Sequence, residues 1–462
     1  MSISRLEGDD LGSCKKSFPI LRFIMLCIQF LLIGCENNVN AVIPTIGDDY
    51  YSLPKVIGNI ENPIVKDYIS NVDYQDDDYT YTEILDYCYR QTDWDKTCPS
   101  PINISVHDSI VQRLTSIGID SLVVQTYRDN QLFRVDSHVL DKEIPIYNLI
   151  PGLTYYYTVL QKVDDNTFHQ IIDGLLEVDG RFRAIYVEGM HNFRDIGGYA
   201  TLYGRRIKYD KLFRSAELQR QTNPSQGDIT ARGVNELINN LRIDVELDFG
   251  DAYTVSPVQN LIEFISDKKY NISYYDIGLN PESTGYTGER YKNCFDIILE
   301  RLKQGKKVLF HCNLGADRTG TLAFILEALL GVNESDLAKD YEITSFFQGY
   351  IRRRDSDYVL DRNSGYPAMI SYIKTHFDGE NINEKVENMM LSLGVTHAQI
   401  EEFRQIMLED NDDNLPTSII HINANNYEKK SSMLGGSFNL SGIRMPYQQH
   451  GITIVDGQKK LK

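Results

Sequence analysis

The stretch Val308-Leu309-Phe310-His311-Cys312-Asn313-Leu314-Gly315-Ala316-Asp317-Arg318-Thr319-Gly320-Thr321 decides the fold of this chain. An apolar run ends at His311, and five residues separate Cys312 from Arg318. Apolar residues at helical spacing then follow at Leu322, Ile325, Leu326 and Leu329. The pattern predicts a buried strand, a tight loop that begins at Cys312, and a helix that starts near Arg318.

The loop has the composition of a phosphate-binding site. Its backbone N–H groups, from Asn313, Leu314, Gly315 and Ala316, can curl around one anion. The start of the following helix adds its positive end. Arg318 can grip two phosphate oxygens with its planar guanidinium, which a lysine cannot do. We therefore expect the four loop residues Asn313, Leu314, Gly315 and Ala316, together with Thr319, to contact the substrate.

The same surroundings favour a thiolate at Cys312 at neutral pH. Gly315 permits the backbone conformation that the curl requires. Thr319 is expected to donate its hydroxyl to the sulfur, and His311 to restrain the cysteine and stabilise its charge. A cysteine followed by five residues and an arginine arises by chance, but the flanking His311, Gly315 and Thr319 make the motif specific. The alternative is a structural cysteine that precedes a helix.

Strands and helices alternate from 184 to 410, which predicts an α/β domain with a mostly parallel sheet and helices on both faces. The expected strands are Ala184–Val187, Ile243–Phe249, Ile272–Ile277 and Lys307–Cys312. The expected helices are Ala231–Leu241, Arg290–Lys303, Thr319–Leu330, Glu334–Thr344, Asn383–Ser392 and Thr396–Leu408. Thr396 and Gln399 form a capping box, and Gly331 and Gly394 fall at helix ends.

Composition excludes several classes of protein. The 462 residues are 42% hydrophobic and 24% charged, which is ordinary for globular domains. The net charge of −18 argues against nucleic acid as a partner, because such binding needs a basic surface. We expect two or three domains and no multi-span membrane protein.

The N-terminus predicts export. Lys15, Lys16 and Arg22 precede the apolar run Phe23–Ile33, which is typical of a signal peptide over 1–34. The run ends Leu-Ile-Gly-Cys, which resembles a bacterial lipobox with Cys35 as the acylated residue. We therefore expect a lipoprotein anchored to the outer membrane of the cell envelope; a plain signal anchor is the alternative.

Residues 35–100 are acidic and poorly periodic, and we interpret them as a tether or small cap. Cys88 and Cys98 either form a disulfide or remain thiols. Short alternating runs from 101 to 183 predict an all-β sandwich. The segment Leu149–Tyr157 resembles the fibronectin type III stretch that places a tyrosine corner. Residues 411–462 form a polar linker and a C-terminal β-hairpin, which resembles the end of type IX sorting domains.

From 184 to 410 the chain resembles the bacterial secreted tyrosine phosphatase family, within the cysteine-dependent protein-tyrosine phosphatase superfamily. That family's loop reads Cys-x-x-Gly-Lys-Asp-Arg-Thr-Gly. Further blocks match in the family's order: His191–Tyr199, Leu212–Leu218, Asp340-Tyr341 and Leu393–Val395. The resemblance implies Cys312 as nucleophile, Arg318 as phosphate clamp, a phosphocysteine intermediate, and no metal or other cofactor. Arg194 and Asp195 are expected to be structural.

The general acid remains open. Asp317 can serve, as in the Asp-Arg-Thr subgroup that includes myotubularin-like lipid phosphatases, or it can hold the loop structurally. Asp248 and Asp251 are rival candidates after the strand Ile243–Phe249. The family usually reads Asp-Leu-Arg there, but this chain reads Asp248-Phe249-Gly250.

The substrate is expected to be a phosphorylated protein or a small phosphate ester. Ala316 stands where the family commonly has the lysine that attracts further phosphates, which favours phosphotyrosine over phosphoinositides or inositol phosphates. Arg352–Arg354 could restore positive charge, although a solvated surface is the more ordinary interpretation. From another class, the alternative function is a phosphate-binding or adhesion lipoprotein without turnover.

Overall fold

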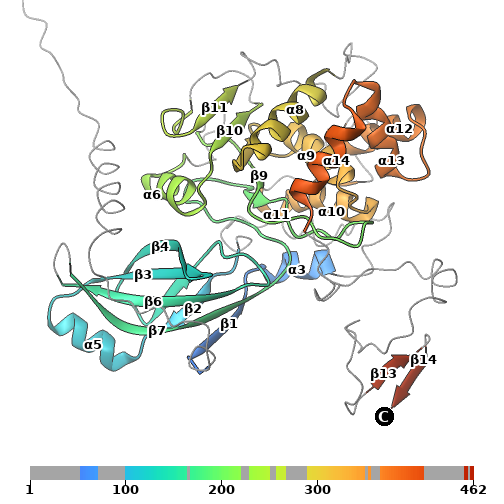
Figure 1. Cartoon of the computed structure of the whole chain (residues 1–462). Helices are drawn as coiled ribbons and strands as arrows, with labels where there is room; N and C mark the ends of the chain where they lie inside the picture. Colours follow the sequence, from blue (N-terminus) through green and yellow to red (C-terminus); the bar gives the residue numbers. More distant parts are fainter. Residues whose placement is uncertain are drawn as a thin grey trace, which may run out of the picture.

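The computed structural model describes residues 52–70, 99–163, 167–219, 228–249, 256–266, 289–348, 352–354, 365–409, 452–455 and 458–461 (Figure 1). The signal segment, Cys35, Cys88, Cys98 and the expected strand Ile272–Ile277 lie outside these residues. Within the described part of the chain, no helix is both long and apolar enough to cross a membrane.

A five-stranded sheet forms the centre of the C-terminal domain, in the order β11-β10-β12-β9-β8. The strands are β8 (Arg194–Asp195), β9 (Leu212–Ser215), β10 (Val245–Asp248), β11 (Glu263–Ser266) and β12 (Val308–His311). Only β8 runs antiparallel to its neighbour. Every residue of β12 is buried, as expected for a central strand of a parallel sheet covered on both faces.

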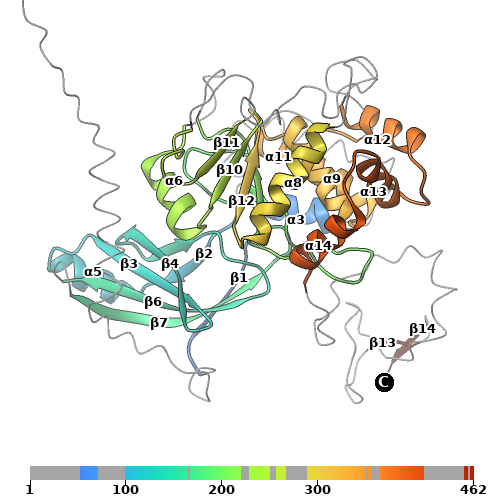
Figure 2. The same ribbon diagram turned by 45° about the horizontal axis from the view of Figure 1, so that its top comes forward.

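Helices cover both faces of this sheet (Figure 2). Val308 and Phe310 of β12 enter one hydrophobic core, and Leu309 between them enters another. This alternation is the period-two pattern of a strand between two layers. The first core is built with α8 (Glu289–Lys303), α9 (Asp317–Leu329), α12 (Gly365–His376), α13 (Ile382–Ser392) and α14 (His397–Met407). The second is built with α6 (Ala231–Asn235) and the π-helical turn η3 (Glu236–Asn240).

The α/β prediction is confirmed, with differences in detail. The capping box of Thr396 and Gln399 is present, and Gly331 and Gly394 adopt positive φ at helix ends. The expected strand Ala184–Val187 is wrong, because Ala184 makes only an isolated bridge to Arg194. Five elements of this domain were not predicted: β8, β9, β11, α12 and the short α11 (Ser345–Gln348). At the C-terminus, the expected hairpin is present as β13 (Ile452–Val455) and β14 (Gln458–Leu461).

The N-terminal unit contains a five-stranded sheet in the order β1-β7-β6-β3-β4 and a two-stranded sheet of β2 and β5. Its elements are β1 (Lys55–Asn59), β2 (Ile102–Ser105), α5 (Asp108–Ser116), β3 (Ser121–Arg128), β4 (Gln131–Val139), β5 (Glu143–Ile146), β6 (Thr154–Lys162) and β7 (Phe168–Asp179). The two sheets and Leu114 of α5 share one core, so the unit departs from an all-β sandwich by a helix. Tyr155 accepts a hydrogen bond from the Ile150 amide at 3.1 Å.

The described part of the expected tether is built into the fold. Strand β1 pairs in parallel with β7 of the N-terminal sheet. Helix α3 (Pro63–Ser70) packs against the C-terminal domain, where its Val65, Tyr68 and Ile69 share a core with Phe346 and Phe347. Residues 52–70 therefore contact both units and do not separate them.

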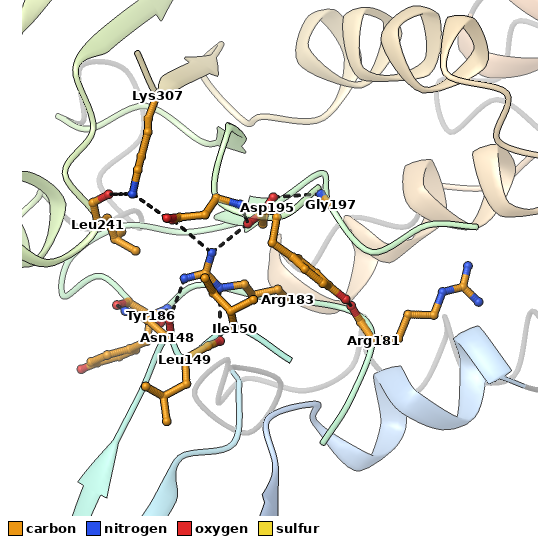
Figure 3. A network of polar contacts seen from close by, with 12 residues as sticks. Asn148, Leu149, Ile150, Arg181, Arg183, Tyr186, Asp195, Gly197, Leu241 and Lys307 are labelled. Atoms are coloured by element: carbon orange, nitrogen blue, oxygen red, sulfur yellow. Dashed lines mark hydrogen bonds and ion pairs between the residues drawn. The ribbon is translucent and has the colours of Figure 1, made fainter. Parts of the chain in front are cut away.

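A buried arginine joins the two units (Figure 3). Arg183 donates to the carbonyls of Asn148 and Leu149 at 2.7 and 3.2 Å, and it pairs with Asp195 at 2.8 Å. Asp195 also accepts from the amides of Gly197 and Asp210. Burial acts to lower the pKa of Arg183, but the charges of Asp195 and Asp210 outweigh burial and raise it. The two units thus meet at a charged and fully paired contact.

Candidate active site

Strand β12 delivers Cys312 to the carboxyl edge of the sheet, and α9 begins at Asp317. Between them, three successive carbonyls face a common set of donors. Asn192 donates to the carbonyls of Leu314 and Gly315 at 3.0 Å each, Arg214 donates to Gly315 at 2.9 Å, and the Glu217 amide donates to Asn313 at 3.2 Å. Because C=O and N–H point oppositely in a trans peptide, the amides of Leu314, Gly315 and Ala316 face the other side of the loop. The loop therefore presents donors on its open side.

Two of these amides have no acceptor within the described residues, namely those of Gly315 and Ala316. Gly315 has φ +64°, a conformation that favours glycine. Unpaired amides beside a helix N-terminus are typical of an anion site. The amides of Gly315 and Ala316 are thus placed to bind an anion, and the roles of Asn313 and Leu314 stay predictions.

Arg318 lies within the first turn of α9 and is mostly buried. Its Nη1 donates to the Phe249 carbonyl at 2.6 Å, at the end of β10. This contact holds the guanidinium beside the loop, where Arg318 is expected to bind phosphate oxygens. Cys312 is 3% exposed and belongs to the same hydrophobic core as Phe310.

His311 lies between two carboxylates. Its Nε2 is 2.9 Å from Glu246 Oε1, and its Nδ1 is 3.6 Å from Asp248 Oδ1. Burial acts to lower the pKa of His311, but Asp248, Glu246 and Cys312 together raise it to about 9. These charges therefore favour the protonated ring, directly beside the cysteine. Sequence reasoning missed Glu246, which is one of three acidic residues that alternate with apolar ones in Ile243–Phe249.

A second buried cluster supports the back of the loop. Asp340 of α10 (Glu334–Ile343) pairs with both Arg194 and Arg214, which come from β8 and β9. Arg194 also donates to the Asp340 carbonyl at 2.8 Å and contacts Asn192. Burial acts to raise the pKa of Asp340, but the two guanidinium groups outweigh burial and lower it. The cluster links α10 to the loop carbonyls through Arg214 and Asn192.

Asp317 stands at the first position of α9, with its side chain 35% exposed. Both of its oxygens accept from Arg352, at 2.9 and 3.0 Å. The interpretation of Arg352–Arg354 as a solvated surface is wrong for two of its members. Arg352 and Arg354 are buried, and Arg354 pairs with Glu342.

One expected contact is absent, and one candidate cannot be placed. Thr319 Oγ1 is buried and has no hydrogen-bond partner among the described residues, so it does not donate to the Cys312 sulfur in this structure. Asp251 lies outside the described residues, whereas Asp248 is beside His311. Within the described part of the chain, no cluster of His, Cys, Asp and Glu is arranged to hold a metal ion.

Residues 185–409 match the model of the tyrosine phosphatase family. A protein of Cupriavidus necator, named "Putative tyrosine-protein phosphatase", is 28% identical over 185 residues, which cover 34% of this chain and 64% of that protein. A "Tyrosine-protein phosphatase" of Nostoc commune is 27% identical over 236 residues, which cover 43% of this chain and 74% of that protein. Residues 185–409 are thus similar to tyrosine phosphatases, and the match spans less than two thirds of the Cupriavidus necator protein.

Proposed function

We propose that this protein hydrolyses phosphate monoesters, with protein phosphotyrosine as its main substrate, through a phosphocysteine intermediate and without a metal ion. The observation that carries the proposal is the loop from Cys312 to Arg318, whose carbonyls are held from behind while its amides face the opposite side. Such an array can hold the charged oxygens of a phosphoryl group throughout the reaction.

The first step is an in-line displacement at phosphorus. The Cys312 sulfur forms a bond to phosphorus while the ester P–O bond breaks, and the leaving oxygen takes a proton from an acid. Water then attacks phosphorus, the S–P bond breaks, and the same carboxylate accepts the proton from water. His311, whose pKa is raised by the charges around it, lies beside the sulfur in both steps.

We infer that Asp317 is the acid in this sequence. Its carboxylate has about four lone-pair sites, and the paired contact with Arg352 uses two of them. Its partly exposed side chain is thus open to a leaving group. Asp248 is the weaker candidate because its side chain is only 15% exposed, against 35% for Asp317. The variants Asp248→Asn and Asp251→Asn test the two rival candidates.

Phosphotyrosine is favoured over phosphoinositides and inositol phosphates by Ala316, which adds no positive charge to the loop. Arg352 does not replace the missing lysine, since its Nε and Nη2 donate to the two carboxylate oxygens of Asp317 and its side chain is buried. A panel of phosphotyrosine and phosphoserine peptides, phosphoinositides and inositol phosphates tests this choice. Faster turnover of the multiply phosphorylated lipids would reverse it.

Hydrolysis of p-nitrophenyl phosphate tests the activity itself. Cys312→Ser should abolish it, EDTA should leave it unchanged, and vanadate should inhibit it. Cys294→Ser is the matched control, because Cys294 is a free, buried cysteine of the same core as Cys312 but lies on α8 and not on the loop. Activity that depends on metal and survives Cys312→Ser would disprove the mechanism. Phosphate binding with no turnover would favour the alternative of a binding lipoprotein.

We also propose that the protein is exported and anchored by lipid at Cys35, on the evidence of the lipobox-like sequence alone. Mass spectrometry of the mature protein should find an acylated N-terminal Cys35, and Cys35→Ser should release the protein from membranes. An intact N-terminus ahead of Cys35 would refute the anchor.

The N-terminal unit is proposed to be a fibronectin type III-like spacer. The Tyr155 hydroxyl reaches back five residues to the Ile150 amide, which is the geometry of a tyrosine corner. Tyr155→Phe should lower the free energy of unfolding by about 1–3 kcal/mol, because that buried amide loses its acceptor. An unchanged unfolding free energy would argue against the corner.

A further inference from the structure

We propose that Arg352 is a positioning residue for Asp317, and that helix α3 holds the segment that carries Arg352. The inference rests on the proposed function, in which Asp317 moves the proton. It extends the catalytic unit to residues 63–70, which lie more than a hundred positions before the matched segment 185–409.

The first observation is the contact between Arg352 and Asp317. The guanidinium donates through Nε and Nη2 to the two oxygens of one carboxylate, a fork-on-fork geometry that fixes direction as well as distance. The Arg352 side chain is only 2% exposed, so it has no freedom to search for another acceptor. The carboxylate of Asp317 is thereby held in one orientation at the start of α9.

The second observation is that Arg352 is itself anchored. Its amide donates to Ser345 Oγ of α11 at 2.7 Å, and Ser345 Oγ donates back to its carbonyl at 3.3 Å. Two residues later, the amide of Arg354 donates to Glu342 Oε1 at 2.9 Å, and its guanidinium donates to Glu342 Oε2. Residues 352–354 are therefore fixed to the end of α10 and the start of α11.

The third observation is that α3 supports these anchors from the other side. The Tyr68 hydroxyl donates to Glu342 Oε2, the same oxygen that the Arg354 guanidinium uses. The buried Lys339 of α10 donates to the Ile69 carbonyl at 2.9 Å. The tilted rings of Tyr68 and Phe346 lie 5.6 Å apart. A continuous set of contacts thus runs from α3 through Glu342 and the 352–354 segment to Asp317.

The inference predicts a specific kinetic signature. A proton donor matters most for a poor leaving group, so misplacing Asp317 should slow phenyl phosphate far more than p-nitrophenyl phosphate. A general loss of structure would slow both esters alike. Comparing the two esters therefore separates positioning from folding.

The experiment uses the mature full chain with Arg352→Lys, Tyr68→Phe and Asp317→Asn. Arg352→Lys keeps the charge but loses the fork, and it should lower kcat for phenyl phosphate by about tenfold and for p-nitrophenyl phosphate by less than about threefold. Tyr68→Phe should also slow phenyl phosphate more than p-nitrophenyl phosphate, and it should lower kcat for phenyl phosphate by about threefold. In the Asp317→Asn background, neither substitution should lower kcat for phenyl phosphate any further. Equal loss on both esters, or full additivity with Asp317→Asn, would overturn the inference.

Tyr156→Phe is the matched control, because Tyr156 also hydrogen-bonds a carboxylate, Asp173 at 2.9 Å, but on the N-terminal sheet. It should leave both ester rates unchanged. Hydrogen exchange gives a readout that needs no turnover. Arg352→Lys and Tyr68→Phe should speed exchange of the amides in the first turn of α9, and unchanged exchange would refute the inference. If the wild-type chain hydrolyses neither ester, the proposed function fails, and the exchange result still decides whether the contacts hold Asp317.

Discussion

Gly315 lies so close to Ser215 that a β-carbon at residue 315 would stand 2.2 Å from the Ser215 carbonyl oxygen. That oxygen belongs to the end of β9, so it cannot move without moving the sheet. Since φ at Gly315 is +64°, a side chain there would also meet an unfavourable backbone conformation. The shape of the loop is therefore fixed by the neighbouring strand as well as by its own sequence.

Gly315→Ala should lower kcat/KM by on the order of 100-fold, because displacing the loop misaligns its amides. Gly204→Ala is the control: Gly204 has φ +71°, but a β-carbon there would meet nothing within 4 Å. Gly204→Ala should lower the free energy of unfolding by about 1–2 kcal/mol, because only the positive φ is unfavourable there. Its activity should be unchanged. Wild-type kinetics in Gly315→Ala would contradict the close contact.

Asp340→Asn should destabilise the protein by about 3–5 kcal/mol, because it leaves the buried guanidinium groups of Arg194 and Arg214 without their shared counter-charge. Denaturant unfolding measures the loss. Asp108→Asn removes an exposed pair with Lys142 and should change stability by less than about 1 kcal/mol. Equal effects of the two substitutions would mean that the cluster behind the loop is not a structural support.

Stability should depend on pH through His311. Its pKa is raised from 6.5 to about 9 in the folded protein, so the stabilisation is fully present below pH 6.5 and is lost as pH rises through 9. The total is roughly 3 kcal/mol by the linkage relation. His311→Gln should remove this part of the pH dependence, measured by urea unfolding from about pH 6 to about pH 10. His397→Gln, at an exposed ring paired with Glu387, should retain the wild-type profile.

Arg183→Met should uncouple the two units, because it removes the donor to Asn148 and Leu149 and leaves Asp195 buried without its charge partner. We expect a loss of about 3–5 kcal/mol and two calorimetric transitions in place of one. Arg128→Met, at an exposed arginine beside Asp129, is the control. A single transition at the wild-type temperature would show that Arg183 does not hold the units together.

The sequence predicted those elements whose signals are local. The strand before Cys312 and the helix after it follow from apolar runs, and the cap at Thr396 follows from the spacing to Gln399. Strand β11 was missed because its four residues carry no distinct pattern and its place is set by parallel pairing with β10. Such pairing depends on tertiary packing and not on propensity.

The candidate site divides in the same way. Cys312, Gly315 and Arg318 were recognisable because the loop is contiguous. Glu246 contacts His311, Arg214 contacts the loop, and Asp340 pairs with Arg214, each from another element. Their partners could therefore not be read from spacing. The exposure of Arg352 was predicted wrongly because a run of three arginines usually faces water. Here the buried Arg352 forms an ion pair with Asp317, and the buried Arg354 forms one with Glu342.

Helix α9 is buried along its whole length from Arg318 to Leu329, even though it begins at the loop. A helix without a solvent-facing side cannot shift or rotate unless the layers around it separate. The position of the phosphate loop therefore depends on the packing of the hydrophobic core. Activity and the folded structure should be gained and lost together.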